Sequence, residues 1–242
     1  MLLAAGRGER MRPLTDRTPK PLLEVGGKSL IAWHIEKLVR ANLHEIIINH
    51  AHLGTQIETA LGDGSHFGAH IRYSSEGSAL ETAGGIAYAL PLLGNDPFAV
   101  INSDIFCDYD FAQLPRLAAA LLAHGDAAHL VLVDNPPQHP NGDFHLHDGH
   151  LLPTNDQRLT TNDLKLTFSG IGIYQTALFK DIPRGSIAPL APLLRAQIAL
   201  GKVSGEHHRG LWTDVGTPQR LAELDSQICS LQKTPRSQHN AP

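Results

Sequence analysis

The hydrophobic residues of this chain recur at two different spacings, which predict alternating strands and helices. Short runs of Val, Ile and Leu bounded by polar residues are typical of buried strands. In residues 29–42 the apolar positions recur every three or four residues, and Ser29 stands before them as a candidate N-cap. We expect strands at 1–4, 45–49, 70–74, 98–102, 127–133, 166–174 and 203–208, and helices at 29–42, 53–61, 82–93, 111–124 and 217–231.

This alternation predicts the fold class. Strands separated by helices favour an α/β fold with a mostly parallel sheet and helices on both faces. The chain has 242 residues, which is enough for one such domain. Prolines and glycines interrupt the pattern between 134 and 165, so we expect an insertion over one end of the sheet there. Residues 1–232 would then form the domain, and 233–242 a flexible tail.

Composition and charge narrow the class of protein. Hydrophobic residues make up 42% of the chain and charged residues 18%, which excludes a disordered or collagen-like protein. The net charge of −4 favours neither nucleic acid nor a membrane surface as a partner, and no apolar run approaches the roughly 18 residues of a membrane span. The two cysteines cannot form a disulfide framework. We expect a cytoplasmic monomer or small homo-oligomer.

The segment after the first strand is rich in glycine and arginine. Glycines let backbone N–H groups approach a ligand closely, and arginine donates two parallel hydrogen bonds, so both suit phosphate oxygens. Two familiar phosphate-binding patterns do not fit: a dinucleotide fingerprint needs glycine where Met11 stands, and a Walker A motif ending at residues 27–29 needs glycine at Leu22.

The same segment resembles a longer signature. The stretch L-A-A-G-x-G-x-R-M-x-P-L-T from Leu3 to Thr15, followed by P-K-P-L-L at 19–23, is similar to that of the sugar-1-phosphate nucleotidyltransferases. The resemblance implies a single-domain Rossmann-like fold of the nucleotide-diphospho-sugar transferase type, with a mixed, mostly parallel central sheet flanked by helices. It also implies that Lys20 lies between the phosphates of two substrates, where flanking prolines would restrict its backbone. Nucleotide phosphates would be held by Ala5, Gly6, Gly8, Glu9 and Arg10, with Arg10 and Lys20 as the catalytic residues.

Two aspartates are candidate metal ligands. Asp104 follows the buried-strand pattern at 98–102, and ligands of open α/β sheets bind beyond such strand ends. Asp214 lies in the segment L-W-T-D-V-G-T-P, which the family resemblance pairs with the first aspartate as a Mg²⁺ site. An alternative is that Asp214 is the ion-pair partner of a nearby arginine, for which Arg209 is available. The nearby D-x-D at 108–110 is better explained by Asp110 as a helix cap, and the histidines at 145, 147 and 150 by solvation.

Two further segments resemble the family's base and sugar subsites. The stretch 74–86 is similar to the nucleobase segment, with Glu81 where the family usually has glycine. A carboxylate only accepts hydrogen bonds, so it suits a base that presents N–H groups, and uracil and guanine both do so. The lysine of the family's E-K-P-like segment is absent from 146–166. The implied base-binding residues are Glu76, Glu81, Thr82 and Gly85, and the implied sugar-binding residues are Asn102, Asn141, Gly142 and Ser169.

The resemblance implies an activity. The enzyme would transfer a nucleoside monophosphate from an NTP to a sugar 1-phosphate with Mg²⁺, releasing pyrophosphate. Among short members of the family, the chain is most similar to the uridylyltransferases that use UTP and N-acetylmuramate 1-phosphate in peptidoglycan recycling. Mannose-1-phosphate guanylyltransferase, glucose-1-phosphate thymidylyl- or uridylyltransferase and, more distantly, phosphocholine cytidylyltransferase are alternatives. A non-catalytic nucleotide-binding regulatory subunit is a remote alternative, because Arg10, Lys20, Asp104 and Asp214 are all present.

Overall fold

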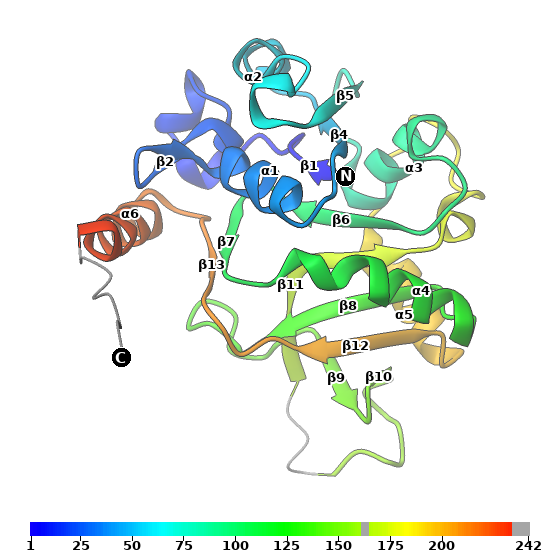
Figure 1. The fold of residues 1–242 in the computed structure, drawn as a ribbon. Helices are drawn as coiled ribbons and strands as arrows, with labels where there is room; N and C mark the ends of the chain where they lie inside the picture. The colour runs from blue at the N-terminus through cyan, green and yellow to red at the C-terminus, as the bar shows by residue number, and fades with distance from the viewer. Residues whose placement is uncertain (161–164, 234–242) are drawn as a thin grey trace, which may run out of the picture.

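A computed structural model describes residues 1–160 and 165–233. Within them a nine-stranded sheet has the order β5-β4-β1-β6-β11-β8-β12-β10-β9 (Figure 1). Its strands are β1 (Leu2–Leu3), β4 (Glu45–His50), β5 (His70–Ser75), β6 (Phe98–Asn102), β8 (Ala128–Val133), β9 (Phe144–His147), β10 (His150–Leu152), β11 (Lys165–Tyr174) and β12 (Val203–His207). Two small ribbons pair β2 (Glu24–Val25) with β3 (Lys28–Ser29) and β7 (Ile105–Cys107) with β13 (Trp212–Asp214).

The sheet is mixed, as in the fold class that the family resemblance implies. Strands β5, β4, β1 and β6 pair in parallel, and so do β8 and β12. The long strand β11 runs antiparallel between β6 and β8 and joins these two parallel groups. The parallel group around β1 ends near β7, β13 and α6, at the left of Figure 1.

Helices cover both faces of the sheet. The α-helices are α1 (Leu30–Arg40), α2 (Gly54–Leu61), α3 (Glu81–Leu93), α4 (Leu114–His124), α5 (Leu190–Ala199) and α6 (Pro218–Lys233). Apolar side chains of α1, α2 and α4 pack in one buried cluster, and those of α3 and α5 pack in another on the opposite face. Short 3-10 helices lie at Glu9–Met11, Leu14–Asp16, Lys20–Leu22, Ser65–Phe67, Phe111–Gln113 and Thr176–Phe179.

The structure shows how the predicted helices begin, and it adds elements that the sequence did not predict. The helix expected at 111–124 begins as the 3-10 turn Phe111–Gln113, where Asp110 accepts a hydrogen bond from the Ala112 amide at 3.0 Å. Ser29 does occupy the N-cap position of α1, but its side chain makes no capping hydrogen bond. Helix α5 and the β7–β13 ribbon were not expected from the sequence. Both are short, and the ribbon strands have three residues each, too few to show a period.

The segment 134–165 adds strands to the far edge of the sheet. Strands β9 and β10 form a hairpin there that pairs with β12 and with the start of β11. Residues 161–164 of the expected insertion lie outside the described residues, and so do 234–242 of the expected tail; Lys233 ends α6. None of the helices within the described ranges is long and apolar enough to cross a membrane.

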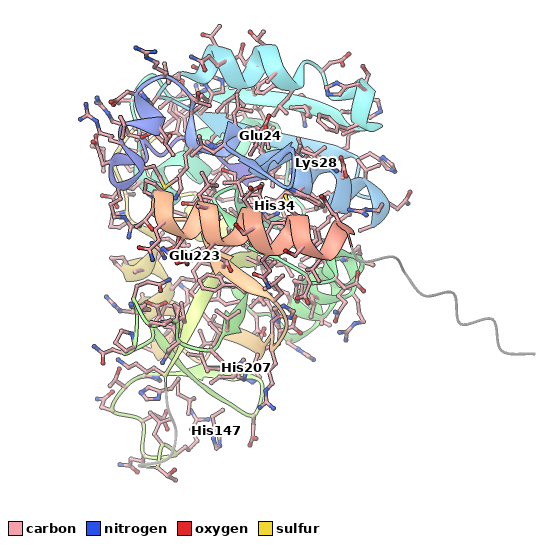
Figure 2. All side chains as sticks on the ribbon, turned by 90° about the vertical axis from the view of Figure 1, so that its left-hand side faces the viewer. Glu24, Lys28, His34, His147, His207 and Glu223 are labelled. Carbon is pink, nitrogen blue, oxygen red and sulfur yellow. The ribbon has the colours of Figure 1, made fainter. Side chains whose placement is uncertain are left out.

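Helix α6 packs beside the β2–β3 hairpin, far from it in sequence. Figure 2 shows Glu223 on this helix below Glu24 and Lys28 of the hairpin, with His207 and His147 toward the opposite end of the molecule. Leu224 and Ile228 of α6 are buried in one cluster with Val25 and Met11. The Gly26 amide donates to the Asp225 carboxylate at 2.7 Å, so the helix is held by both packing and hydrogen bonding.

Candidate active site

An open cavity of about 380 Å³ lies where β1, β4 and β6 end. This is the edge at which open α/β sheets bind ligands. Among the residues lining it are ten that the sequence motifs predict: Ala5, Gly6, Gly8, Glu9, Arg10, Lys20, Glu81, Thr82, Asn102 and Asp104. The cavity therefore brings together residues from distant parts of the chain, from Leu3 to Gly216.

Gly8 of the glycine-rich loop packs closely against Thr15 and Lys20. Its φ of +68° is in the left-handed region, and a Cβ there would lie 3.0 Å from Thr15 Cγ2 and 3.3 Å from Lys20 Cβ. The Thr15 hydroxyl donates to the Gly8 carbonyl at 2.8 Å. Backbone conformation and close packing thus both require glycine at this position.

Lys20 is buried and paired with Asp104. It is 7% exposed, and its Nζ lies 2.6 Å from Asp104 Oδ2. The backbone at Pro19, before Lys20, is extended, and Lys20 begins a 3-10 helix with Pro21 in its first turn. The ammonium therefore faces the cavity on a short, restricted backbone segment, beside the carboxylate predicted to bind a metal.

The β7–β13 ribbon carries Asp214 to the vicinity of Asp104. Asp214 pairs in register with Ile105, and the Val215 amide donates to the Asp104 carbonyl at 3.0 Å. The Asp214 carboxylate lies 2.8 Å from Arg220 Nη1. The alternative that Asp214 pairs with a nearby arginine is therefore met by Arg220 and not by Arg209, whose guanidinium is directed to His207. Asp214 lines a second cavity, of about 240 Å³, with Trp212, Arg220 and Glu223 among its other residues.

A chain of hydrogen bonds lies beneath the first cavity. Asn49 Oδ1 accepts from the Ala4 amide at 2.9 Å, and its Nδ2 donates to Glu76 Oε1 at 2.6 Å. The other Glu76 oxygen accepts from the Leu80 amide at 3.1 Å. Burial raises the pKa of Glu76, and the hydrogen bond from Asn49 opposes that shift. Its carboxylate thus joins β1, β4 and the loop before α3.

Two predicted base-binding residues belong to this network rather than to the cavity lining. Neither Glu76 nor Gly85 lines the cavity. A Cβ on Gly85 would lie 2.5 Å from Glu76 Oε1, so the glycine makes room for that carboxylate. Glu81 and Thr82 do line the cavity, and Glu81 has a φ of +58°. That conformation favours glycine, which accounts for the glycine usual at this position in the resembling family.

Three of the four predicted sugar-binding residues lie away from both cavities. Ser169 is 1% exposed, and its hydroxyl donates to the Val131 carbonyl at 2.7 Å. Gly142 forms a turn against Lys165, and Asn141 is exposed beside it. Asn102 lines the first cavity, where it packs against Gly170. Ser169 is instead used inside the sheet, at the irregularity where β11 shifts register against β8.

The sequence motifs did not predict Arg220, Asn49 and Ser103. Asn49 and Ser103 line the first cavity, and Arg220 lines the second. A signal for Asn49 and Ser103 exists, since both stand at or just after the ends of predicted strands. In the described ranges no group of three or more His, Cys, Asp or Glu side chains could enclose a metal ion, so the histidines of the 145–150 segment form no such cluster.

Comparison with known proteins decides the family. The family model described as nucleotidyl transferase matches residues 1–148. The N-acetylmuramate alpha-1-phosphate uridylyltransferase of Neisseria meningitidis serogroup B is 56% identical over 228 residues, covering 93% of this chain and 96% of that protein. The enzyme of the same name from Caulobacter vibrioides is 35% identical and covers 94% and 96%. The chain belongs to the sugar-1-phosphate nucleotidyltransferase family.

The solved structures agree with this nucleotidyltransferase fold. A putative glucose-1-phosphate thymidylyltransferase from Bacillus anthracis superimposes with a TM-score of 0.79 at 22% identity, covering 94% of each chain. The expected fold class is therefore confirmed. The match at 1–148 includes the glycine-rich loop, Lys20 and Asp104, whereas Asp214 and Arg220 lie beyond it. From the segment beyond the match, Gly216, between β13 and α6, lines the first cavity, and Asp214 and Arg220 line the second.

Proposed function

We propose that this nucleotidyltransferase transfers UMP from UTP to N-acetylmuramate 1-phosphate in cytoplasmic peptidoglycan recycling. The products would be UDP-N-acetylmuramate and pyrophosphate. The observation that carries the choice of substrates is the 56% identity with the Neisseria uridylyltransferase, aligned over 96% of that protein. Residues 1–232 would form the catalytic domain.

The reaction needs charge neutralisation more than proton transfer. An oxygen of the sugar phosphate attacks the α-phosphorus of UTP, a new O–P bond forms, and the bond to the β-phosphate oxygen breaks. The nucleophile is already an anion, so no general base is required. Lys20 lies at the cavity wall beside Asp104, where its ammonium would draw the two phosphates together. Arg10 and the N–H groups of the Gly6–Gly8 loop would hold the departing pyrophosphate.

Asp104, which lines the first cavity, and Asp214, which lines the second, fit a divalent cation. Mg²⁺ typically takes one or two protein carboxylates and completes its octahedron with water and phosphate oxygens. Asp104 and Asp214 would supply those carboxylates, since the β7–β13 pairing brings their backbones together. A bound Mg²⁺ would neutralise charge on the reacting phosphate oxygens.

Glu81 is the residue proposed to choose the base. It lines the cavity at the start of α3, and its carboxylate accepts hydrogen bonds only. Uracil presents its N3–H to such an acceptor, whereas cytosine presents an unprotonated nitrogen at the same edge. Glu81 would therefore favour UTP over CTP.

The experiment is a substrate matrix read by pyrophosphate release. UTP, GTP, CTP and dTTP are each combined with N-acetylmuramate 1-phosphate, glucose 1-phosphate and mannose 1-phosphate, with Mg²⁺. We expect turnover with UTP, fastest with the muramate acceptor. A signal confined to GTP and mannose 1-phosphate would contradict the proposed substrates.

A pair of aspartate variants tests the site itself. Asp104→Asn should lower kcat/KM by about 10²–10³-fold, as the loss of a charge-stabilising group does. Asp110→Asn is the matched control, because Asp110 caps a 3-10 helix outside both cavities and should keep turnover. Equal turnover by the two variants would contradict the role given to Asp104.

A further inference from the structure

Arg220 is a partly buried cation that the proposed reaction leaves without a role. It lies in the first turn of α6, and its side chain is 16% exposed. Nη1 lies 2.8 Å from Asp214 Oδ2, and Nε donates to the Thr217 hydroxyl at 3.4 Å. The contacts of Nη1 with Asp214 and of Nε with Thr217 therefore hold the guanidinium beside the Asp214 carboxylate.

The backbone of Gly216 lies close to the guanidinium groups of both Arg220 and Arg10. A Cβ at residue 216 would lie 2.3 Å from Arg220 Nη2 and 3.2 Å from Arg10 Nη2. Asp214 Oδ2 would lie 3.0 Å from the same point. Two guanidinium groups thus converge over one residue, and the Asp214 carboxylate offsets their repulsion. Gly216 also lines the first cavity, so this cluster stands at its edge.

The two carboxylates proposed for Mg²⁺ share one feature. Asp104 is paired with Lys20 at 2.6 Å, and Asp214 with Arg220 at 2.8 Å. A carboxylate oxygen that coordinates a divalent cation loses most of its attraction for an organic cation beside it. Each pairing would therefore weaken when the carboxylates bind a metal, and the released cations would face the place where phosphates must lie.

We propose that Arg220 is a second phosphate-binding arginine, which Asp214 holds until a divalent cation takes its carboxylate. The guanidinium then pairs with phosphate oxygens beside Arg10. This inference rests on the proposed function. Binding of metal and of phosphate would then favour each other. The metal takes the Asp214 carboxylate and frees Arg220 for phosphate, and phosphate takes Arg220 and frees Asp214 for the metal.

The test compares Arg220→Gln with Arg209→Gln by calorimetry. Arg209 carries the same charge five residues before Asp214 but contacts His207 instead, so it is the matched control. With Mn²⁺ alone, Arg220→Gln should bind the ion about two- to fivefold more tightly, since Asp214 has lost a competing cation. In the presence of Mn²⁺, it should bind UTP or N-acetylmuramate 1-phosphate about tenfold more weakly.

The two phosphate ligands distinguish where Arg220 acts. A loss for UTP alone assigns it to the nucleotide, and a loss for the sugar phosphate alone assigns it to the acceptor. Arg220→Lys should recover part of the lost affinity if charge is what matters. Unchanged affinity for both ligands, or weaker Mn²⁺ binding by Arg220→Gln, would overturn the proposal and leave Arg220 as a structural partner of Asp214.

These binding measurements do not depend on the identity of the reaction. If wild-type protein released no pyrophosphate with any substrate pair, the proposed function would fail. The affinities for Mn²⁺ and for the two phosphate ligands would still report on Arg220.

Discussion

The ammonium of Lys20 lies 2.6 Å from the carboxylate of Asp104, although 84 positions separate the two residues. The pair joins a 3-10 turn near the N-terminus to the end of β6. Lys20 is almost fully buried, whereas 36% of the Asp104 side chain is exposed. Of the two partners, the Asp104 carboxylate is therefore the one that is accessible to a metal or a substrate.

Lys20 should contribute far more to turnover than a comparable ion pair elsewhere. We expect Lys20→Met to lower kcat/KM by about 10²–10³-fold, because the variant loses the charge between the reacting phosphates. Lys28→Met is the control: Lys28 pairs with Glu36 at the same 2.6 Å but lines neither the first nor the second cavity. Steady-state kinetics measure both, and a similar loss in the two variants would contradict the prediction.

Gly8 should be sensitive for two separable reasons. Gly8→Ala places a side chain at a positive φ and pushes it toward Lys20, so both stability and activity should fall. Gly27→Ala has the same kind of backbone, with φ +74°, and open space around the new Cβ. Both variants should lose about 1–2 kcal/mol in urea denaturation, but only Gly8→Ala should lose activity. Full activity in Gly8→Ala would show that the loop does not position Lys20.

The side chain of Glu81 should lower the stability of the fold while it selects the nucleobase. Glu81→Gly removes a side chain from a positive φ and should raise the free energy of unfolding by up to about 1 kcal/mol. It should also reduce the preference for UTP over CTP by about tenfold, because a charged hydrogen-bond acceptor is lost. Leu53→Gly relieves a φ of +54° outside the cavity and should leave the preference unchanged. Kinetics with the two nucleotides decide whether the predicted base contact exists.

His34 should make the fold sensitive to mild acid. Burial lowers the pKa of His34 to about 4, and its Nε2–H donates to the Ile105 carbonyl at 2.8 Å. The unfolded chain takes up the proton near pH 6.5, before the folded protein does, so stability is full above that pH and falls as the pH drops toward 4. Urea denaturation should show a loss of about 2 kcal/mol from this group between pH 7 and 5.

The matched variants separate that effect from acid sensitivity in general. His34→Gln can still donate to Ile105 and should lose this part of the pH dependence. His70→Gln removes an exposed imidazole and should keep it. Identical pH profiles for all three proteins would show that His34 is not the group responsible.

Local sequence patterns predict most of the residues that line the first cavity. The glycine-rich loop, Pro19-Lys20-Pro21 and Asp104 each carry their own signal, because a tight turn, a restricted backbone or a strand end is a property of neighbouring residues. Glu76 shows the limit: its place in the motif suggests a base contact, and the structure adds that its carboxylate accepts hydrogen bonds from Asn49 and the Leu80 amide. These neighbours across the fold are not part of the motif.

The alternating apolar runs and the phosphate loop were enough to determine the α/β class and the end of the sheet at which ligands collect, since both follow from the periodicity of the backbone and the direction of parallel strands. Only the tertiary structure decided which charges meet. Two three-residue strands with no period of their own bring the backbone of Asp214 beside that of Asp104, and the Asp214 carboxylate pairs with Arg220 in the first turn of α6. Electrostatic partners depend on distances across the fold, which no local pattern contains.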